Sequence, residues 1–216
     1  MAGDLQRQAR EFAEDIQRIL NTTICTGVRI AARPSTTPGY AVVGYGISRS
    51  SDETLPFPVH IGSRKPRCWL HLGYELSLDK TGRFLTVFSS FFSVQTGPQE
   101  ASCLCHFDYE RDKPGGYPEA HLQVNGVSPA LASWPGKTNT RELGRLHFPV
   151  GGRRFRPTVE DVIEFLIVEG LAEPREGWRT ALDARRRDWE RIQLRAAMRS
   201  DPESSAELLG EFGEAA

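Results

Sequence analysis

The chain has 216 residues and a mass of 24.1 kDa, and 39% of its residues are hydrophobic, which suits one medium-sized globular domain with a core of its own. Its 27 Lys and Arg residues nearly balance 28 Asp and Glu residues. The resulting formal net charge of −1 excludes a global basic field that would attract nucleic acid or an anionic membrane. Four cysteines without a Cys-x-x-Cys pair exclude a disulfide scaffold, a zinc ribbon and a thioredoxin-type redox centre.

The sequence contains no targeting or cofactor motif. No run of about 18 apolar residues is present, so we predict no membrane span. The chain starts with charged amphipathic residues rather than an apolar signal region, which favours a cytoplasmic protein. We expect no cofactor and no structural metal, because phosphate-loop, dinucleotide and zinc-ligand spacings are all missing.

The first predicted element is a helix from Asp4 to about Leu20, whose apolar residues recur at helical spacing. Strand-like segments follow, separated by turn sequences such as Asp79-Lys80-Thr81-Gly82, which is favourable hairpin chemistry. About seven strands are predicted, in segments 24–32, 40–47, 70–78, 84–94, 102–110, 119–125 and 145–150, with 59–61 as a short edge strand.

Two helices are predicted after the last strand. Thr158 and Asp161 form a capping-box pattern for the first helix, and the second runs from about Glu176 to Arg199. The order of elements therefore predicts an α+β fold, in which a largely antiparallel sheet of about seven strands is flanked by an N-terminal helix and two C-terminal helices. We expect a single domain over residues 1–200 and a flexible acidic tail over residues 201–216.

Polar side chains are predicted to meet on one face of three successive strands. Alternating apolar residues indicate that His106 and Asp108 share the polar face of one strand. The same alternation places His121 on that face of the next strand, and His147 on that face of the last strand. We therefore predict that these four side chains converge, and they are our candidate catalytic residues.

Three kinds of chemistry fit such a cluster. Two imidazoles near a carboxylate could act as general acid and base near neutral pH, with Arg111 or Arg145 holding a phosphate. That set suffices for metal-independent RNA cleavage, in which a base deprotonates the 2′-hydroxyl and an acid protonates the leaving oxygen. The same side chains could instead chelate a divalent metal, or form hydrogen bonds across a solvated sheet face.

Four motifs between residues 102 and 170 match a family pattern of an Arg-Tyr-Asp-like strand, a His strand, a Phe-Pro strand and a closing helix. They are Phe107-Asp108-Tyr109-Glu110-Arg111, Tyr117-Pro118-Glu119-Ala120-His121, His147-Phe148-Pro149 and Val162-Ile163-Glu164-Phe165-Leu166. In these motifs the chain resembles the small TumE-type toxins of toxin–antitoxin pairs. The family commonly has a second histidine beside the first, whereas here Gln123 stands two residues after His121. The resemblance implies a toxin-like or defence-associated protein that acts on RNA as a ribonuclease and is controlled by a protein partner.

Arginines are concentrated after the last strand and along the second C-terminal helix. Arginine suits phosphate recognition, but the acidic residues between these arginines also fit a solvated helix face. A third interpretation is a partner-binding helix that the acidic tail masks until the partner arrives. The alternative function is thus a non-catalytic adaptor in a multi-protein or nucleic-acid assembly. Candidate nucleic-acid contacts are Arg111, Arg145, Arg153, Arg154, Arg185, Arg186, Arg187 and Arg191.

Overall fold

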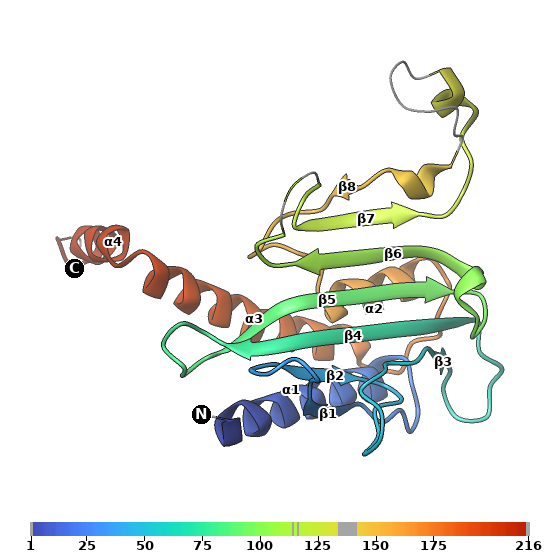
Figure 1. Ribbon diagram of the computed structural model, residues 1–216, viewed down its shortest axis with the longest axis horizontal. Helices are drawn as coiled ribbons and strands as arrows, with labels where there is room; N and C mark the ends of the chain where they lie inside the picture. The colour runs from blue at the N-terminus through green and yellow to red at the C-terminus, as the bar shows by residue number, and fades with distance from the viewer. Residues whose placement is uncertain (1, 114, 116, 134–141, 215–216) are drawn as a thin grey trace.

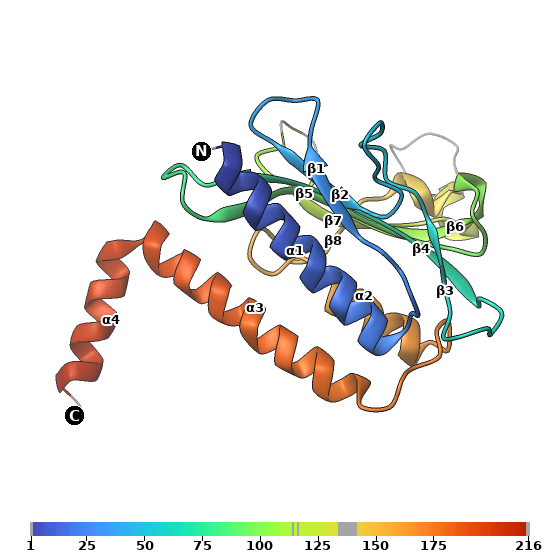
Figure 2. The same cartoon turned by 90° about the horizontal axis from the view of Figure 1, so that it is seen from below.

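An eight-stranded sheet, in which every strand pair is antiparallel, forms the centre of the protein. The computed structural model describes residues 2–113, 115, 117–133 and 142–214. Figures 1 and 2 show that the helices lie on one side of the sheet. This arrangement confirms the predicted α+β architecture.

The strand order in the sheet is β1-β2-β4-β5-β6-β7-β8, and β3 pairs with β4 beside this path. Successive strands from β4 to β8 are neighbours, so the C-terminal half of the sheet is a simple meander (Figure 1). The strands are β1 (Ala31–Pro34), β2 (Ala41–Gly44), β3 (Phe57–Val59), β4 (Cys68–Leu78), β5 (Leu85–Gln95), β6 (Cys103–Glu110), β7 (Ala120–Val124) and β8 (Phe148–Pro149).

Four α-helices complete the described structure: α1 (Ala2–Thr23), α2 (Val159–Val168), α3 (Trp178–Ser200) and α4 (Pro202–Glu214). Thr158 caps α2, because its side chain accepts the Asp161 N–H while the Asp161 carboxylate accepts the Thr158 N–H. The predicted capping box is therefore confirmed. Three short 3-10 helices connect the strands, at Glu100–Ser102, Pro129–Ser133 and Leu143–Arg145.

The hairpin between β4 and β5 has the predicted turn. The Asp79 carboxylate accepts backbone N–H groups from Arg83 and Phe84 at 3.0 and 3.1 Å, and Gly82 has a φ of 71°. Positive φ is easily adopted by glycine because it has no Cβ atom. The turn sets the register of the adjoining strand ends, and a bulge between Glu75 and Leu76 shifts this register by one residue before the strands reach the site.

Three predicted strands are shorter than expected, and one of them, 40–47, yields only Ala41–Gly44. Segment 24–32 yields only β1, because α1 side chains bind the backbone of the residues before it: Asn21 bonds both Val28 N–H and its carbonyl, and Gln17 accepts Ile30 N–H. The prediction for 145–150 was likewise wrong in extent, since only Phe148–Pro149 pairs with β7.

The segment before β8 forms a 3-10 turn instead of a strand. Leu146 N–H donates to the Leu143 carbonyl, which holds Arg145 in that turn. Phe148, expected to face the core, is 38% exposed. Pro149 has no N–H to extend a strand ladder, which is a physical reason for the short pairing.

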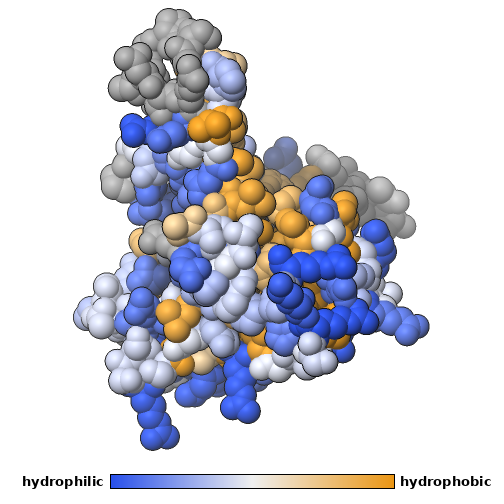
Figure 3. All heavy atoms as spheres, turned by 90° about the vertical axis from the view of Figure 1, so that its right-hand side faces the viewer, coloured by the Kyte–Doolittle hydropathy of each residue, from blue (hydrophilic) through white to orange (hydrophobic). Residues whose placement is uncertain are grey.

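The core lies between the sheet and the helices. Leu70, Leu72 and Leu76 of β4 are fully buried, and Ile163 and Leu166 of α2 are fully buried as well. At the end of the sheet seen in Figure 3, hydrophilic side chains cover much of the surface, with hydrophobic ones grouped near the middle. Among the described residues, the helices include none with the length and apolarity needed to cross a membrane.

The C-terminal part of α3 and the whole of α4 extend away from the sheet (Figure 2). Residues 202–214 of the segment expected to be a flexible tail therefore form a helix. The two helices expose large apolar side chains, namely Ile192, Leu194, Met198, Leu208 and Leu209.

Candidate active site

The sheet register aligns rows of side chains on the face opposite the helices, which we call the open face. The central row follows directly from Cα partners on four neighbouring strands: Gly73, Phe91, Asp108 and His121. One flanking row contains Glu75, Ser89 and Glu110, and the other contains His71, Ser93, His106 and Gln123.

Asp108 lies at the centre of a group of imidazoles. Its Oδ2 atom is 3.5 Å from Nε2 of His106 and 3.5 Å from Nε2 of His121. The ring centroids of His121 and His147 are 4.7 Å apart. The prediction that these four side chains meet on one sheet face is therefore confirmed, although His147 reaches the group from the irregular segment before β8 rather than from a strand.

His121 is held in one tautomer by the backbone. Its Nδ1 atom is 3.1 Å from the Pro118 carbonyl oxygen, which can only accept, so Nδ1 carries a hydrogen. The other nitrogen, Nε2, faces Asp108. The side chain is only 3% exposed, more buried than the solvated position expected for an outward strand residue. The neutral imidazole thus presents an unprotonated Nε2 on the side where Asp108 lies.

Asp108 is a carboxyl group whose burial opposes ionisation. Desolvation raises the pKa of Asp108, while the nearby His106, His121, Lys113 and His147 act in the opposite direction and do not cancel the rise. A carboxyl with a raised pKa holds a proton closer to neutral pH than an exposed aspartate does. Asp108 and His121 can therefore share a proton, which is a property of acid–base sites.

His106 has a different environment from His121. The Gln123 side-chain amide donates to the Gly144 carbonyl at 2.6 Å, which leaves its Oε1 to accept from His106 Nε2–H at 2.9 Å. Because this hydrogen bond occupies Nε2, His106 is placed to orient Asp108 rather than to accept a proton there. His106 is also absent from the residues that line the neighbouring cleft.

A cleft of about 580 Å³ opens over the row that contains Asp108 and His121. This volume lies within the range of small-molecule sites. Its lining consists of Val42, Asp52, Glu53, Thr54, Gly73, Tyr74, Glu75, Ser89, Ser90, Phe91, Asp108, Tyr109, Glu110, Lys113, Tyr117, His121, Gln123 and His147.

The β6–β7 connection supplies two lining residues that were not among the predicted site residues. The Tyr117 ring stacks on His147, with centroids 4.1 Å apart and planes 18° from parallel. The Lys113 ammonium lies 4.6 Å from the Tyr117 ring centroid and forms an ion pair with Glu110. The sequence signal was the Gly-rich loop before β7, but a loop sequence alone does not say where its side chains point.

The four candidate arginines near the sheet do not line the cleft. Arg145 pairs with Glu142 and its side chain is 64% exposed, while Arg111 donates to the Val87 carbonyl. Arg153 is bound by Asp112 and Glu119, and Arg154 donates to Ser200. Among the described residues, Lys113 is the only lysine or arginine in the lining.

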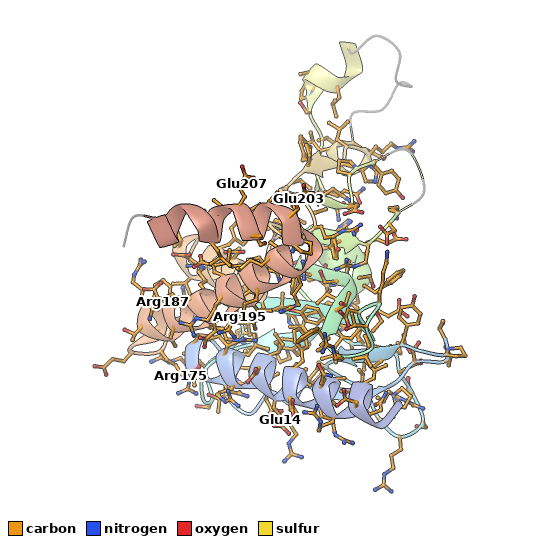
Figure 4. All side chains as sticks on the ribbon, turned by 90° about the vertical axis from the view of Figure 1, so that its left-hand side faces the viewer. Glu14, Arg175, Arg187, Arg195, Glu203 and Glu207 are labelled. Atoms are coloured by element: carbon orange, nitrogen blue, oxygen red, sulfur yellow. The ribbon has the colours of Figure 1, made fainter. Side chains whose placement is uncertain are left out.

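The candidate arginines of α3 fall into two groups. Arg185 lies 3.5 Å from Glu160 and 3.8 Å from Asp15, and Arg186 pairs with Asp161 and Glu164, so both connect α3 to neighbouring helices. Arg187 and Arg191 are exposed instead. Figure 4 shows the labelled Arg187 and Arg195 along α3, with Glu203 and Glu207 on α4. The first group has a structural role, and only the second is open to a partner.

The described residues contain no group of three or more His, Cys, Asp or Glu side chains arranged to hold a metal ion. Comparisons with known proteins gave no match: no family model fits the chain, and neither a curated protein nor a solved structure is significantly similar to it. The resemblance to TumE-type toxins therefore stays a prediction.

Proposed function

We propose that the protein is a metal-independent ribonuclease of the toxin or defence type, controlled by a protein partner. One observation carries the proposal: Nε2 of His121 faces a half-buried Asp108, and His147 lies beside it in the same cleft. Two imidazoles and a carboxyl with a raised pKa are the groups that general acid–base catalysis near neutral pH requires.

The reaction needs two proton transfers. His121 Nε2 takes the proton of a ribose 2′-hydroxyl, and the resulting oxygen attacks the adjacent phosphorus. His147, protonated beforehand, gives its proton to the departing 5′-oxygen as the P–O bond breaks. The products are a 2′,3′-cyclic phosphate and a free 5′-hydroxyl.

The surrounding groups support these roles. The Pro118 carbonyl orients the base by holding Nδ1–H, and Asp108 stabilises the imidazolium that forms on His121. Tyr117 orients the acid by stacking on His147. Lys113 supplies a cation at the same end of the cleft for the phosphate.

The test is cleavage of a fluorescent RNA oligonucleotide by the purified full-length chain in the presence of EDTA. We expect a cyclic phosphate at the new 3′ end, and a 10²–10⁴-fold lower rate for His121→Gln and for His147→Ala. Gln at 121 retains a donor for the Pro118 carbonyl, so the fold is preserved. His60→Ala is the matched control, because the His60 side chain bonds the nearby Gly62 carbonyl and lies outside the lining. Equal rates for His121→Gln and wild type would disprove the proposal.

A second candidate function, a non-catalytic adaptor, is favoured by the exposed apolar residues of α3 and α4. A helix of 13 residues such as α4 is marginal alone in water and gains stability by burying an apolar face. If the chain is an adaptor, Leu194→Ser with Leu208→Ser will abolish binding to its partner, while His121→Gln will leave both binding and biological activity unchanged. The opposite pattern supports the enzyme.

A further inference from the structure

Glu75 is a carboxylate in the cleft to which the proposed reaction assigns no role. It lies on the open face of β4, opposite Ser89 of β5, and it is half-buried. Burial raises the pKa of Glu75. No described residue forms a hydrogen bond or ion pair with its side chain. The oxygens of Glu75 are therefore available to a ligand that donates hydrogen bonds.

The basic side chains of the cleft gather at one end, together with Asp108 and with Glu110, which pairs with Lys113. Lys113, His121 and His147 lie at the end formed by β6, β7 and the segment before β8. Glu75 lies at the other end, beside the wall formed by Asp52 and Glu53. A ligand that matches this cleft has an anionic group at one end and hydrogen-bond donors at the other.

Two glycines bring the acidic wall against the sheet. A Cβ atom on Gly44 would lie 2.3 Å from Thr54 Cγ2, and one on Gly73 would lie 3.2 Å from Thr54 Oγ1. The Thr54 hydroxyl is also 2.8 Å from His71 Nε2, which fixes the loop in place. The acidic end is therefore a built wall rather than a loose surface loop.

An aromatic side chain lines the cleft on the central strand β5. Phe91 is the Cα partner of Gly73 on one side and Asp108 on the other, and its ring packs against His71 and His106, with centroids 5.2 and 5.9 Å apart. RNA-binding proteins commonly stack an unpaired base on such a ring and read its Watson–Crick edge by hydrogen bonds.

A nucleotide is a ligand that would fit across β4, β5 and β6. Glu75 and Asp108 are two strands apart, roughly 10 Å across the sheet, and two residues apart along it. His121 lies one strand further, but its Nε2 is 3.5 Å from Asp108 Oδ2, so a nucleoside on Phe91 with its base edge at Glu75 would place its ribose 2′-hydroxyl beside both side chains.

Resting on the proposed ribonuclease function, we propose that Glu75 makes the cleft specific for guanine. Guanine places N1–H and its 2-amino group side by side, so that both donate to the two oxygens of one carboxylate, which only accepts. Adenine and cytosine have an acceptor next to the amino group on this edge. The single N–H of uracil lies between two carbonyl oxygens, which a carboxylate repels.

The test measures binding of the four nucleoside 3′-monophosphates to the full-length chain by titration calorimetry, without RNA cleavage. We expect guanosine 3′-monophosphate to bind at least tenfold more tightly than the other three. Glu75→Gln should remove this preference, because one donor of the Gln amide then faces a donor of the base. Glu14→Gln removes the same charge from the exposed surface of α1, outside the cleft, so it is the control and should keep the preference.

The outcomes separate the two proposals. Equal binding of all four nucleotides, or a guanosine preference that survives Glu75→Gln in a folded variant, overturns the role of Glu75 even if RNA is cleaved. A guanosine preference that depends on Glu75 in a chain that does not cleave RNA supports guanine recognition and removes the ribonuclease function. Thermal unfolding of Glu75→Gln shows whether a loss of binding arises from misfolding.

Discussion

The two faces of the sheet are made from alternate residues of the same strands, but charged side chains on the two sides of the sheet have different partners. Among the helices that cover one face, Glu160 of α2 is 2% exposed and lies 3.5 Å from Arg185 of α3. On the open face, Glu75 has no such partner among the described residues, and Asp108 faces imidazoles at 3.5 Å. The Glu160–Arg185 pair stabilises the fold, whereas Glu75 and Asp108 are available to a ligand.

His121 and Leu122 are adjacent in β7, yet one belongs to the candidate site and the other to the core. Leu122 packs against the core, and His121 points into the cleft. Because side chains alternate between faces along a strand, adjacent substitutions in β7 test different properties. The comparison predicts that substitutions on the helix side lower stability, and that those on the open side alter the chemistry of the site.

The largest stability effect is expected at Leu72, which is fully buried on the helix-covered face. Leu72→Ala removes apolar burial and leaves a cavity, so we expect the free energy of unfolding in urea to fall by about 2–5 kcal/mol. Ser89→Ala on the open face is the comparison variant, with an expected change below about 0.5 kcal/mol. Equal losses for the two variants would show that the faces do not differ in this way.

A somewhat smaller effect is expected when a charge pair between helices is broken. Arg185→Ser leaves the buried Glu160 without the guanidinium that lies beside it, and we expect a loss of about 3 kcal/mol in the free energy of unfolding. Arg187→Ser removes an exposed arginine from the same helix and should change it by less than about 0.5 kcal/mol. If both variants are as stable as wild type, Arg185 has no structural role.

The pH dependence of stability tests the burial of Asp108. Its raised pKa means that the folded chain binds this proton more tightly than the unfolded chain does, so the group's contribution to stability is lost as the pH rises through the folded-state pKa. Asn does not titrate. The free energy of unfolding of wild type relative to Asp108→Asn should therefore fall as the pH rises from about 4 to neutral. A difference that is constant with pH contradicts the raised pKa.

The smallest effect on stability is expected for Arg187→Ser combined with Arg191→Ser, because both side chains are exposed. The double variant tests the alternative function directly. If α3 binds nucleic acid, each lost phosphate contact lowers the slope of log K against log salt by about one, so the slope should fall by about two. Unchanged binding by the double variant would identify these arginines as a solvated helix face.

Much of the fold could be predicted because its causes are local. The helical spacing after Asp4, the turn at Asp79 and the capping box at Thr158 each depend on a few neighbouring residues. Alternation along one strand is also local, which explains why His106, Asp108 and His121 were placed on the correct face. Segment 24–32 was mispredicted because the side chains of Asn21 and Gln17, on the preceding helix, replace its strand hydrogen bonds.

The full set of residues that line the cleft could not be predicted from local sequence patterns. Alternation of apolar and polar residues was enough to assign the histidines to the polar face, because side chains two residues apart in a strand point to the same side of the sheet. Only the tertiary structure brought Glu75 and Phe91 to the same cleft, because strand order and register decide which residues of distant segments are partners. It also turned Arg185 toward Glu160, since helix packing, rather than the spacing of arginines, selects which charges are buried in pairs.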